Sequence, residues 1–368
     1  MADRTFNLWV FGDAHVGTER RHGWESLSHV LQQSETGLAG APPFDWDMAV
    51  DVGDMSGDQG LPSEAEGREI VRQFAALRSH PREAIYSVCG NHDRSGISEP
   101  PNHWWRRWID PTGEHTADSG VNAARRPFPI EGSWERYAVR VGNLLFLMMS
   151  DINEPSQRVG RDHLGGNPAG VVSGETFDWW RGMVESNPEC LILSVHHYML
   201  RDTTVASGPW EGLLRNPDGS WMSGYHGFKP QGAPEGASYL YFVGGRPNAG
   251  AFEDYLAARP GAVSFWLGGH THTHPDDTYG GKSHVETKWG THFINCAAVT
   301  RHHCCQCHPG VPMSRVFSFT EGSDRVRIRC YLHTDHFAAP GWYQPAERTV
   351  TLRRPFRAPR TGIRPGKG

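Results

Sequence analysis

Short apolar segments alternate along the chain with turns that are rich in glycine, aspartate, asparagine and histidine. Apolar runs of this length, bounded by turn residues, are typical of buried strands. The strands predicted in this way each lead into a polar turn, and they cover residues 6–11, 48–52, 85–89, 191–195 and 264–267. Two later apolar runs, over 316–319 and 326–332, enclose a turn and predict a hairpin.

Apolar residues at helical spacing separate these strands. Ser63 and Glu66 have the spacing of a capping box, and Ile70 and Phe74 continue on one apolar face. Similar faces predict helices around residues 24–31, 177–184 and 252–256. Strands that alternate with helices favour a largely parallel sheet, in which ligands bind beyond the carboxyl ends of the strands. The polar turns lie at such ends.

The composition is that of a soluble folded protein with an excess of histidine. Hydrophobic residues make up 38% of the chain, and a net charge of -5 argues against a generally basic nucleic-acid binder. The longest apolar run, 144–149, is far shorter than the roughly 20 residues that a membrane helix needs. No secretory signal pattern is visible, so we expect a cytoplasmic protein whose seven cysteines are reduced. The 21 histidines favour a metalloenzyme.

The polar turns contain the ligand types that Zn, Mn and Fe prefer, namely imidazoles, carboxylates and an amide oxygen. The candidate residues, in chain order, are Asp13, His15, Asp54, Asn91, His92, His196, His270 and His272. Asp-x-His and His-x-His place both donors on the same side of an extended segment, because side chains alternate with a period of two. We therefore expect a metal centre at the carboxyl edge of the sheet.

In these turns the sequence resembles the calcineurin-like metallophosphoesterase family, over about residues 5–300. The motifs that carry the resemblance are Gly12-Asp13-Ala14-His15, Gly53-Asp54, Gly90-Asn91-His92-Asp93, His196 and Gly269-His270-Thr271-His272. The resemblance implies an α/β fold, a four-layer αββα sandwich of two mixed β-sheets flanked by helices. The predicted C-terminal hairpin would belong to the second sheet.

The resemblance also implies a dinuclear site of two divalent or trivalent metal ions, such as Mn, Fe or Zn. It assigns Asp13, His15 and His272 to the first metal, Asn91, His196 and His270 to the second, and Asp54 to a bridging position. A metal-bridging hydroxide would attack the phosphorus in line. His92 would contact the phosphate and help the leaving group depart, and Asp93 would orient His92 by a hydrogen bond.

Two parts of this site stay open at the sequence level. Either His196 or His197 could be the ligand, since the two are adjacent; the resemblance favours His196, which leaves His197 as a candidate substrate contact. The segment 302–308, with three histidines and three cysteines, could hold an extra metal or could be a loop with buried thiols, and its spacing matches no paired Cys-x-x-Cys zinc motif. Within it, His302 or His303 could contact the substrate phosphate.

We predict a single domain over 1–346, with insertions at about 94–135 and 201–250, and a basic, proline-containing, poorly ordered tail over 347–368. The first insertion contains Trp104, Trp105 and Trp108, which could form a stacking platform; the spacing of Trp104 and Trp108 favours a buried helix face instead. The second insertion is rich in glycine and is expected to border the mouth of the site.

The predicted function is a metal-dependent hydrolase of phosphate esters, acting on a diester or a monoester. A small-molecule phosphate ester is the expected substrate and no membrane partner is expected. A nucleic acid stays open as a less favoured partner, and the sequence does not indicate an oligomeric state. The alternatives are a nuclease of the same fold and a catalytically silent protein-binding scaffold. Metal content separates the scaffold from both enzymes.

Overall fold

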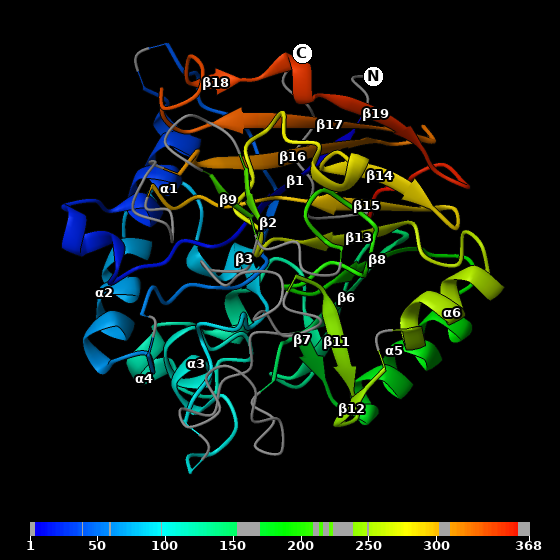
Figure 1. The fold of residues 1–368 in the computed structure, drawn as a ribbon, viewed down its shortest axis with the longest axis horizontal. Helices are drawn as coiled ribbons and strands as arrows, with labels where there is room; N and C mark the ends of the chain where they lie inside the picture. Colours follow the sequence, from blue (N-terminus) through cyan, green and yellow to red (C-terminus); the bar gives the residue numbers. More distant parts are fainter. Residues whose placement is uncertain are drawn as a thin grey trace.

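Two large mixed β-sheets stack face to face in the computed structural model of the protein (Figure 1). The structure describes residues 4–38, 40–58, 60–96, 98–152, 170–208, 213–215, 221–223, 238–248, 250–301 and 310–359. Each large sheet has seven strands. Within the described ranges no helix is both long and apolar enough to cross a lipid bilayer.

The first sheet has the strand order β18-β17-β16-β1-β2-β3, and β19 pairs with β17. Its parallel part, β1 to β3, contains three of the predicted strands, and β16 and β17 form the predicted antiparallel hairpin. The bounds are β1 (Thr5–Phe11), β2 (Met48–Asp51), β3 (Ile85–Ser87), β16 (Met313–Thr320), β17 (Arg325–Leu332), β18 (Gly341–Trp342) and β19 (Arg348–Thr351).

The second sheet has the strand order β14-β15-β13-β8-β6-β5-β4. Its central strands, β15, β13, β8 and β6, are parallel. Of these, β13, β8 and β6 are nearly continuously apolar, as expected for strands that are covered on both faces. Antiparallel strands close both edges. The bounds are β4 (Ile130–Gly132), β5 (Arg136–Val141), β6 (Leu144–Met149), β8 (Leu191–Val195), β13 (Phe265–Gly268), β14 (Val285–Lys288) and β15 (Thr291–Asn295).

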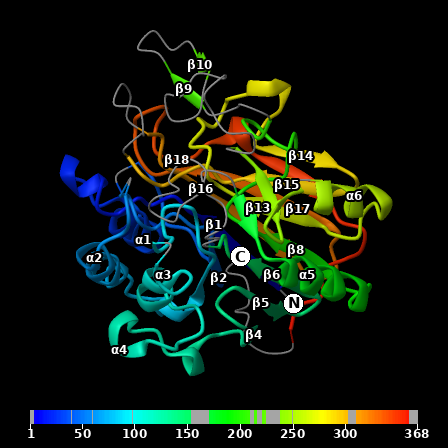
Figure 2. The ribbon, with the colours of Figure 1, turned by 60° about the horizontal axis from the view of Figure 1, so that its bottom comes forward.

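Helices cover the outer face of each sheet, and Figure 2 shows the two helical layers on opposite sides of the molecule. On the first sheet lie α1 (Ser26–Thr36), α2 (Glu64–Phe74) and α3 (His103–Trp108), beside the short α4 (Thr116–Ser119). On the second lie α5 (Gly174–Ser186) and α6 (Gly250–Ala258). The predicted capping box is present at α2: Ser63 Oγ accepts from Glu66 N at 3.2 Å, and the Glu66 carboxylate accepts from Ser63 N at 2.7 Å.

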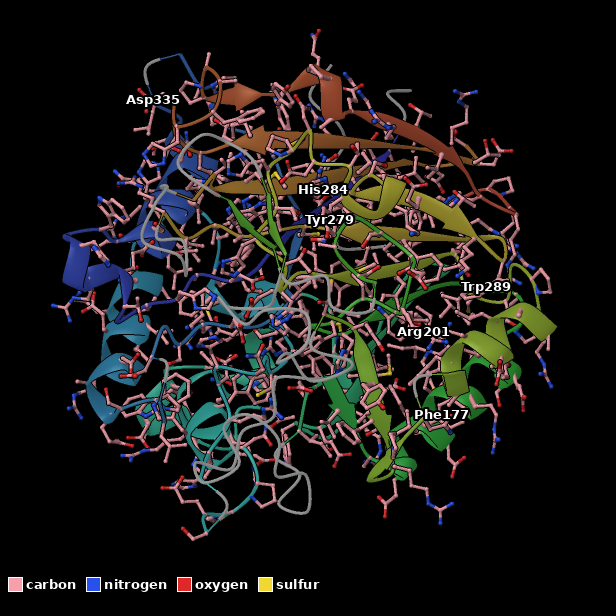
Figure 3. The ribbon with its side chains drawn as sticks, viewed as in Figure 1. Phe177, Arg201, Tyr279, His284, Trp289 and Asp335 are labelled. Atoms are coloured by element: carbon pink, nitrogen blue, oxygen red, sulfur yellow. The ribbon has the colours of Figure 1, made fainter. Side chains whose placement is uncertain are left out.

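The largest apolar core lies between the two sheets and contains alternate residues of their strands, such as Leu8 of β1, Leu193 of β8 and Phe317 of β16. The other side chains of each strand pack under the helices. Figure 3 labels two aromatic residues of the outer layer of the second sheet, Phe177 on α5 and Trp289 at the turn between β14 and β15. The four-layer αββα prediction is therefore confirmed.

The tryptophan-rich segment is a buried helix, as its spacing favours. Trp104, Trp105 and Trp108 of α3 are at most 4% exposed, and they pack in the core beneath the helices of the first sheet. Arg107 of the same helix pairs at the surface with Glu64 and Asp118. No stacking platform for a base is formed by these rings.

The second insertion contributes two small sheets. One is the pair β9 (Leu213–Arg215) and β10 (Trp221–Ser223). The other joins β11 (Leu240–Val243) to β12 (Arg246–Pro247) and to β7 (Gly170–Val172). The remaining positions between 209 and 237 lie outside the described residues, so the expected role of this insertion at the mouth of the site stays a prediction.

The C-terminal segment is folded further than its composition suggests, which corrects the predicted boundary at 346. Strand β19 pairs with β17, and Phe356 is completely buried between the sheets. Two arginines anchor this stretch: Arg353 donates to the carbonyls of Pro188 and Cys190, and Arg354 donates to those of Pro188 and Glu189. The basic side chains thus bond to backbone oxygens, and only residues 360–368 lie beyond the described part.

Candidate metal centre

The polar turns after β1, β2, β3, β8 and β13 meet at one edge of the two sheets. The first two turns are tied together by their backbones: Asp13 N donates to Gly53 O at 2.7 Å, and His15 N donates to Asp54 O at 3.1 Å. The turn after β13 joins them, because His270 N donates to both carboxylate oxygens of Asp13 at 3.1 Å. Residues more than 250 positions apart in sequence therefore share one site.

The first group of ligand atoms comes from Asp13, His15 and His272, and all of these atoms lie within 4.8 Å of one another. His272 Nε2 is 3.0 Å from Asp13 Oδ1 and 3.0 Å from His15 Nε2. Two imidazole nitrogens that face each other at this distance cannot both donate a proton. Their convergence beside a carboxylate is the arrangement in which lone pairs hold a borderline metal ion.

The second group comes from Asp54, His197 and His270, again with ligand atoms within 4.8 Å of one another. His197 Nε2 lies 3.2 Å from Asp54 Oδ2 and 3.1 Å from Asn91 Oδ1. Its other ring nitrogen, Nδ1, lies 2.9 Å from the carbonyl oxygen of Val52. A hydrogen bond from Nδ1 to a backbone carbonyl is the usual way to keep Nε2 free for a metal.

Asp54 lies between the two groups. Its Oδ2 atom is 3.2 Å from His197 Nε2 and 3.8 Å from His15 Nε2, so one carboxylate faces a ligand of each group. Its Oδ1 atom accepts a hydrogen bond from His92 N at 2.8 Å. This is the placement that a bridging carboxylate requires.

The two adjacent histidines after β8 point in different directions. Leu191, Leu193 and Val195 face the core between the sheets, and His197 continues this series toward Asp54. The side chain of His196 points to the opposite side of this extended segment, and its Nε2 atom lies 3.9 Å from Asp151 Oδ1 instead. The alternation of a strand is a sequence-level signal that favours His197, and our prediction of His196 did not use it.

His92 lies against the first group, with its ring 4.7 Å from that of His15 and a ring nitrogen within 4.8 Å of the Asp54 carboxylate. Its Nδ1 atom is 2.8 Å from the carbonyl oxygen of Asp58. Asp93 bonds to backbone: its carboxylate accepts from the N–H groups of Asp54, Ser56 and Gly90 at 2.8–3.0 Å. The structure therefore places the Asp58 carbonyl, and not the Asp93 carboxylate predicted from the sequence, against the ring of His92.

Several candidate ligands have a left-handed backbone, which is uncommon for residues other than glycine. The φ angles are 54° at Asp13, 47° at His15, 57° at Asp54, 73° at His270 and 46° at His272. Strain of this kind is typical of functional sites, where the surrounding fold holds residues in positions that they would not adopt alone.

The charges of the site are arranged to receive a cation. Burial would raise the pKa of Asp13, but His197, His15 and His272 outweigh this effect and lower it. Burial would likewise lower the pKa of His197, yet the carboxylates of Asp54 and Asp13 raise it to about 10. Buried carboxylates that remain ionised need a positive partner, and a protonated His197 or a metal ion can supply it.

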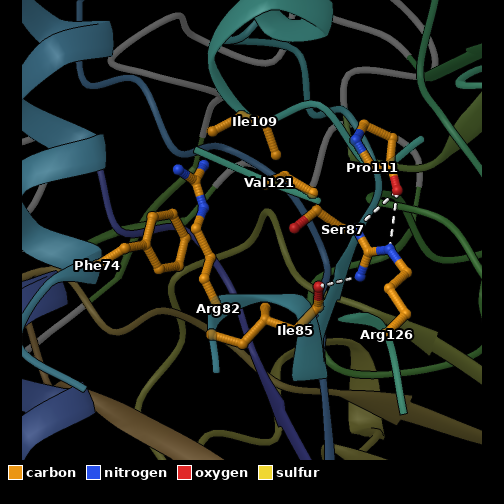
Figure 4. Close-up of a pocket in the computed structure, with 8 residues that line it drawn as sticks. All are labelled: Phe74, Arg82, Ile85, Ser87, Ile109, Pro111, Val121 and Arg126. Carbon is orange, nitrogen blue, oxygen red and sulfur yellow. Dashed lines mark hydrogen bonds between the residues drawn. The ribbon is translucent and has the colours of Figure 1, made fainter. Parts of the chain in front are cut away.

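A small pocket elsewhere is no substrate site (Figure 4). It lies between β3 and the segment that follows α3, and its cavity of about 10 Å³ holds at most one water molecule. Arg126 in its wall donates to the carbonyls of Pro111, Glu83 and Ile85, and Arg82 donates to those of Ser119 and Trp108. These arginines tether the first insertion to the sheet.

His302 and His303 lie outside the described residues, as does the rest of the Cys/His-rich segment up to 309. Thr300, which precedes it, donates its N–H to the carbonyl of Asp13 at 3.1 Å. The cysteines that the structure does describe, Cys89, Cys190, Cys296 and Cys330, are buried free thiols. The substrate contacts expected from His302 and His303 stay predictions.

The chain is similar to one known family over most of its length: the family model described as calcineurin-like phosphoesterase matches residues 6–274. No curated protein matches the chain. A solved structure of vacuolar protein sorting 29 from Cryptosporidium parvum has 12% identity and a TM-score of 0.37, over 95% of this chain and 100% of that chain. A solved structure of a single mutant of Vps29 from Entamoeba histolytica has 12% identity and a TM-score of 0.35, and the match again covers 95% of this chain and 100% of that chain. Likenesses this low carry no argument about activity.

Proposed function

Because the chain belongs to the calcineurin-like phosphoesterase family, we propose that it is a metal-dependent hydrolase of phosphate esters with a dinuclear centre. The observation that carries this proposal is the convergence of carboxylate oxygens and imidazole nitrogens in two groups, which a third group of His15, Asp54 and His92 connects. Each ligand type that such a centre needs is present.

We assign Asp13, His15 and His272 to the first metal and Asn91, His197 and His270 to the second, with Asp54 between them. His197 thus replaces His196 in the ligand set. The distance of 3.1 Å between His197 Nε2 and Asn91 Oδ1 supports this choice. A pair of Mn, Fe or Zn ions bound there would supply the positive charge that stabilises the transition state and would lower the pKa of a water molecule.

The chain's own residues orient the reaction. His92 donates from Nδ1 to the Asp58 carbonyl, so Nε2 is the ring atom that can give a proton to the leaving-group oxygen when the ring is protonated as an imidazolium. Asp93 is a positioning residue: by accepting from the backbone of Asp54 and Gly90 it keeps the turns after β2 and β3 at a constant separation. The substrate that we propose is a small-molecule phosphate diester or monoester.

The test is metal content followed by a substrate panel. The purified protein is expected to hold two metal ions per chain and to hydrolyse a chromogenic phosphodiester or monoester. A metal-free protein without activity would identify a protein-binding scaffold. Cleavage of single-stranded DNA in preference to both small esters would identify a nuclease.

Variants then test the ligand assignment. Asp54→Asn is expected to lower occupancy at both positions, since one carboxylate serves both ions, and His197→Ala is expected to remove the second ion only. His333→Ala is the matched control, because His333 is a buried histidine that bonds to Ser314 and Gln33 under α1. Normal occupancy and turnover in Asp54→Asn would contradict the bridging assignment.

A further inference from the structure

Three buried polar residues form a chain behind the second half of the site. Arg94, Asp151 and His196 are at most 2% exposed. Arg94 Nε lies 3.4 Å from Asp151 Oδ2, and His196 Nε2 lies 3.9 Å from Asp151 Oδ1. Three charged or polar side chains are costly to bury, so their grouping points to a role that offsets this cost.

Arg94 and His196, the outer two of these three residues, each adjoin a candidate ligand of the second metal. Arg94 follows Asn91 by three residues in the turn after β3, and its Nε atom also lies 3.5 Å from the Asn91 carbonyl oxygen. His196 directly precedes His197 in the turn after β8. Asp151, which follows β6, therefore stands between the two turns that supply Asn91 and His197.

The ring of His196 faces Asp151 without a hydrogen bond between them. Tyr198 N donates to His196 Nδ1 at 3.0 Å, so Nδ1 is the acceptor nitrogen of the neutral ring. Nε2 lies 3.9 Å from Asp151 Oδ1, which is beyond hydrogen-bond distance, so the ring and the carboxylate interact electrostatically. Asp151 thus lies between the guanidinium of Arg94 on one side and the imidazole ring of His196 on the other.

Asp151 itself is firmly held. Its Oδ1 atom accepts from Val171 N at 2.6 Å, and its own N–H donates to the Cys89 carbonyl at 2.9 Å. Strand β6 also pairs directly with β8, so the carboxylate stands on a rigid element next to the turn of His196 and His197. A fixed charge in this place can set the spacing of the two turns.

We propose that Asp151 is a positioning residue that holds Asn91 and His197 in register for the second metal, acting through Arg94 and His196. The inference rests on the proposed dinuclear centre. The residues assigned to the first metal lie on the turns after β1 and β13, and neither turn carries Arg94, Asp151 or His196. Loss of the Asp151 charge should therefore weaken the second metal and spare the first.

The experiment is a calorimetric titration of the metal-free protein with Mn²⁺ alone. His197→Ala and His272→Ala identify which binding step belongs to which position. Asp151→Asn is expected to bind the first Mn²⁺ as the unmodified protein does and the second about 10–100-fold more weakly, the usual effect of removing a partner that orients a ligand. Asp110→Asn is the matched control, because Asp110 is a buried carboxylate that bonds to Glu114, His115 and Ser119 in the first insertion.

A second pair of variants keeps the test decisive if Asp151→Asn does not fold. His196→Ala should weaken the second step alone, and His196→Gln, which keeps a polar N–H group beside Asp151, should restore much of it. Unchanged second-step affinity in these variants, or an equal loss at both steps with a lowered melting temperature, would overturn the positioning role. Failure of the unmodified protein to bind two Mn²⁺ ions would overturn the proposed function as well.

Discussion

A methyl group at Gly90 tests whether Asp54 must occupy its observed position. A Cβ atom at residue 90 would stand 2.2 Å from Asp54 Oδ1 and 2.4 Å from Asp54 N. Ordinary contact between such atoms needs roughly 3.5 Å, so the gap is too short by about 1 Å. Gly90→Ala therefore forces the central carboxylate, or the turn that carries it, to move.

The surroundings leave little freedom for that movement. Asp54 Oδ1 accepts from His92 N, Asp54 N donates to Asp93, and Gly90 N donates to the same Asp93 oxygen. A displacement of about 1 Å in a positioning group can cost on the order of 10² in rate. We expect a loss of this size in kcat, together with weaker binding of both metals, because Asp54 faces both groups.

The assay measures metal per chain, turnover of bis(4-nitrophenyl) phosphate and the melting temperature. Gly182→Ala is the control, since a Cβ there would meet nothing within 4 Å and the residue lies inside α5. That variant should keep its metals and gain roughly 0.5–1 kcal/mol of stability. If Gly90→Ala retained two metals and near-normal turnover, the reasoning about the position of Asp54 would be refuted.

The other predictions concern acid catalysis, a helix cap and a distant carboxylate. His92→Ala should keep both metals and lose about 10²–10⁴ in rate, with a smaller loss for 4-nitrophenyl esters than for alkyl esters; an equal loss for both would argue against proton donation. Ser63→Ala should lower the free energy of unfolding, measured with urea, by about 0.5–2 kcal/mol, because it removes the capping box of α2; its metal content should be unchanged. For Glu35, burial would raise the pKa, but His80 and three backbone N–H groups lower it below its ordinary 4.5. The ionised carboxylate of Glu35 therefore stabilises the fold above that pH. Glu35→Gln should lower the free energy of unfolding in urea at pH 7, and this loss should shrink as the pH falls below 4.5. A loss that stayed constant with pH would contradict this prediction.

Local pattern predicted the parts of the protein that depend on near neighbours. Apolar runs of four to six residues followed by polar turns located the strands after which Asp13, Asp54, Asn91 and His270 lie. The spacing of Ser63 and Glu66 predicted the start of α2, because a capping box is closed within four residues. These features need no knowledge of the rest of the chain.

Side-chain direction and long-range contacts were decided by the tertiary structure. Whether His196 or His197 meets Asp54 depends on which face of β8 turns toward the first sheet, and the Asp58 carbonyl reaches His92 only because the turn after β2 folds over it. Phe356 lies in an apparently basic tail, yet it packs 6.3 Å from the ring of Phe6, at the other end of the chain. The amino-acid sequence by itself therefore determined where along the chain these strands and the ligand-bearing turns lie, since side-chain alternation and helix capping act over a few residues. Only the packing of the two sheets decided which atoms converge, because hydrogen bonds and burial join residues that are hundreds of positions apart.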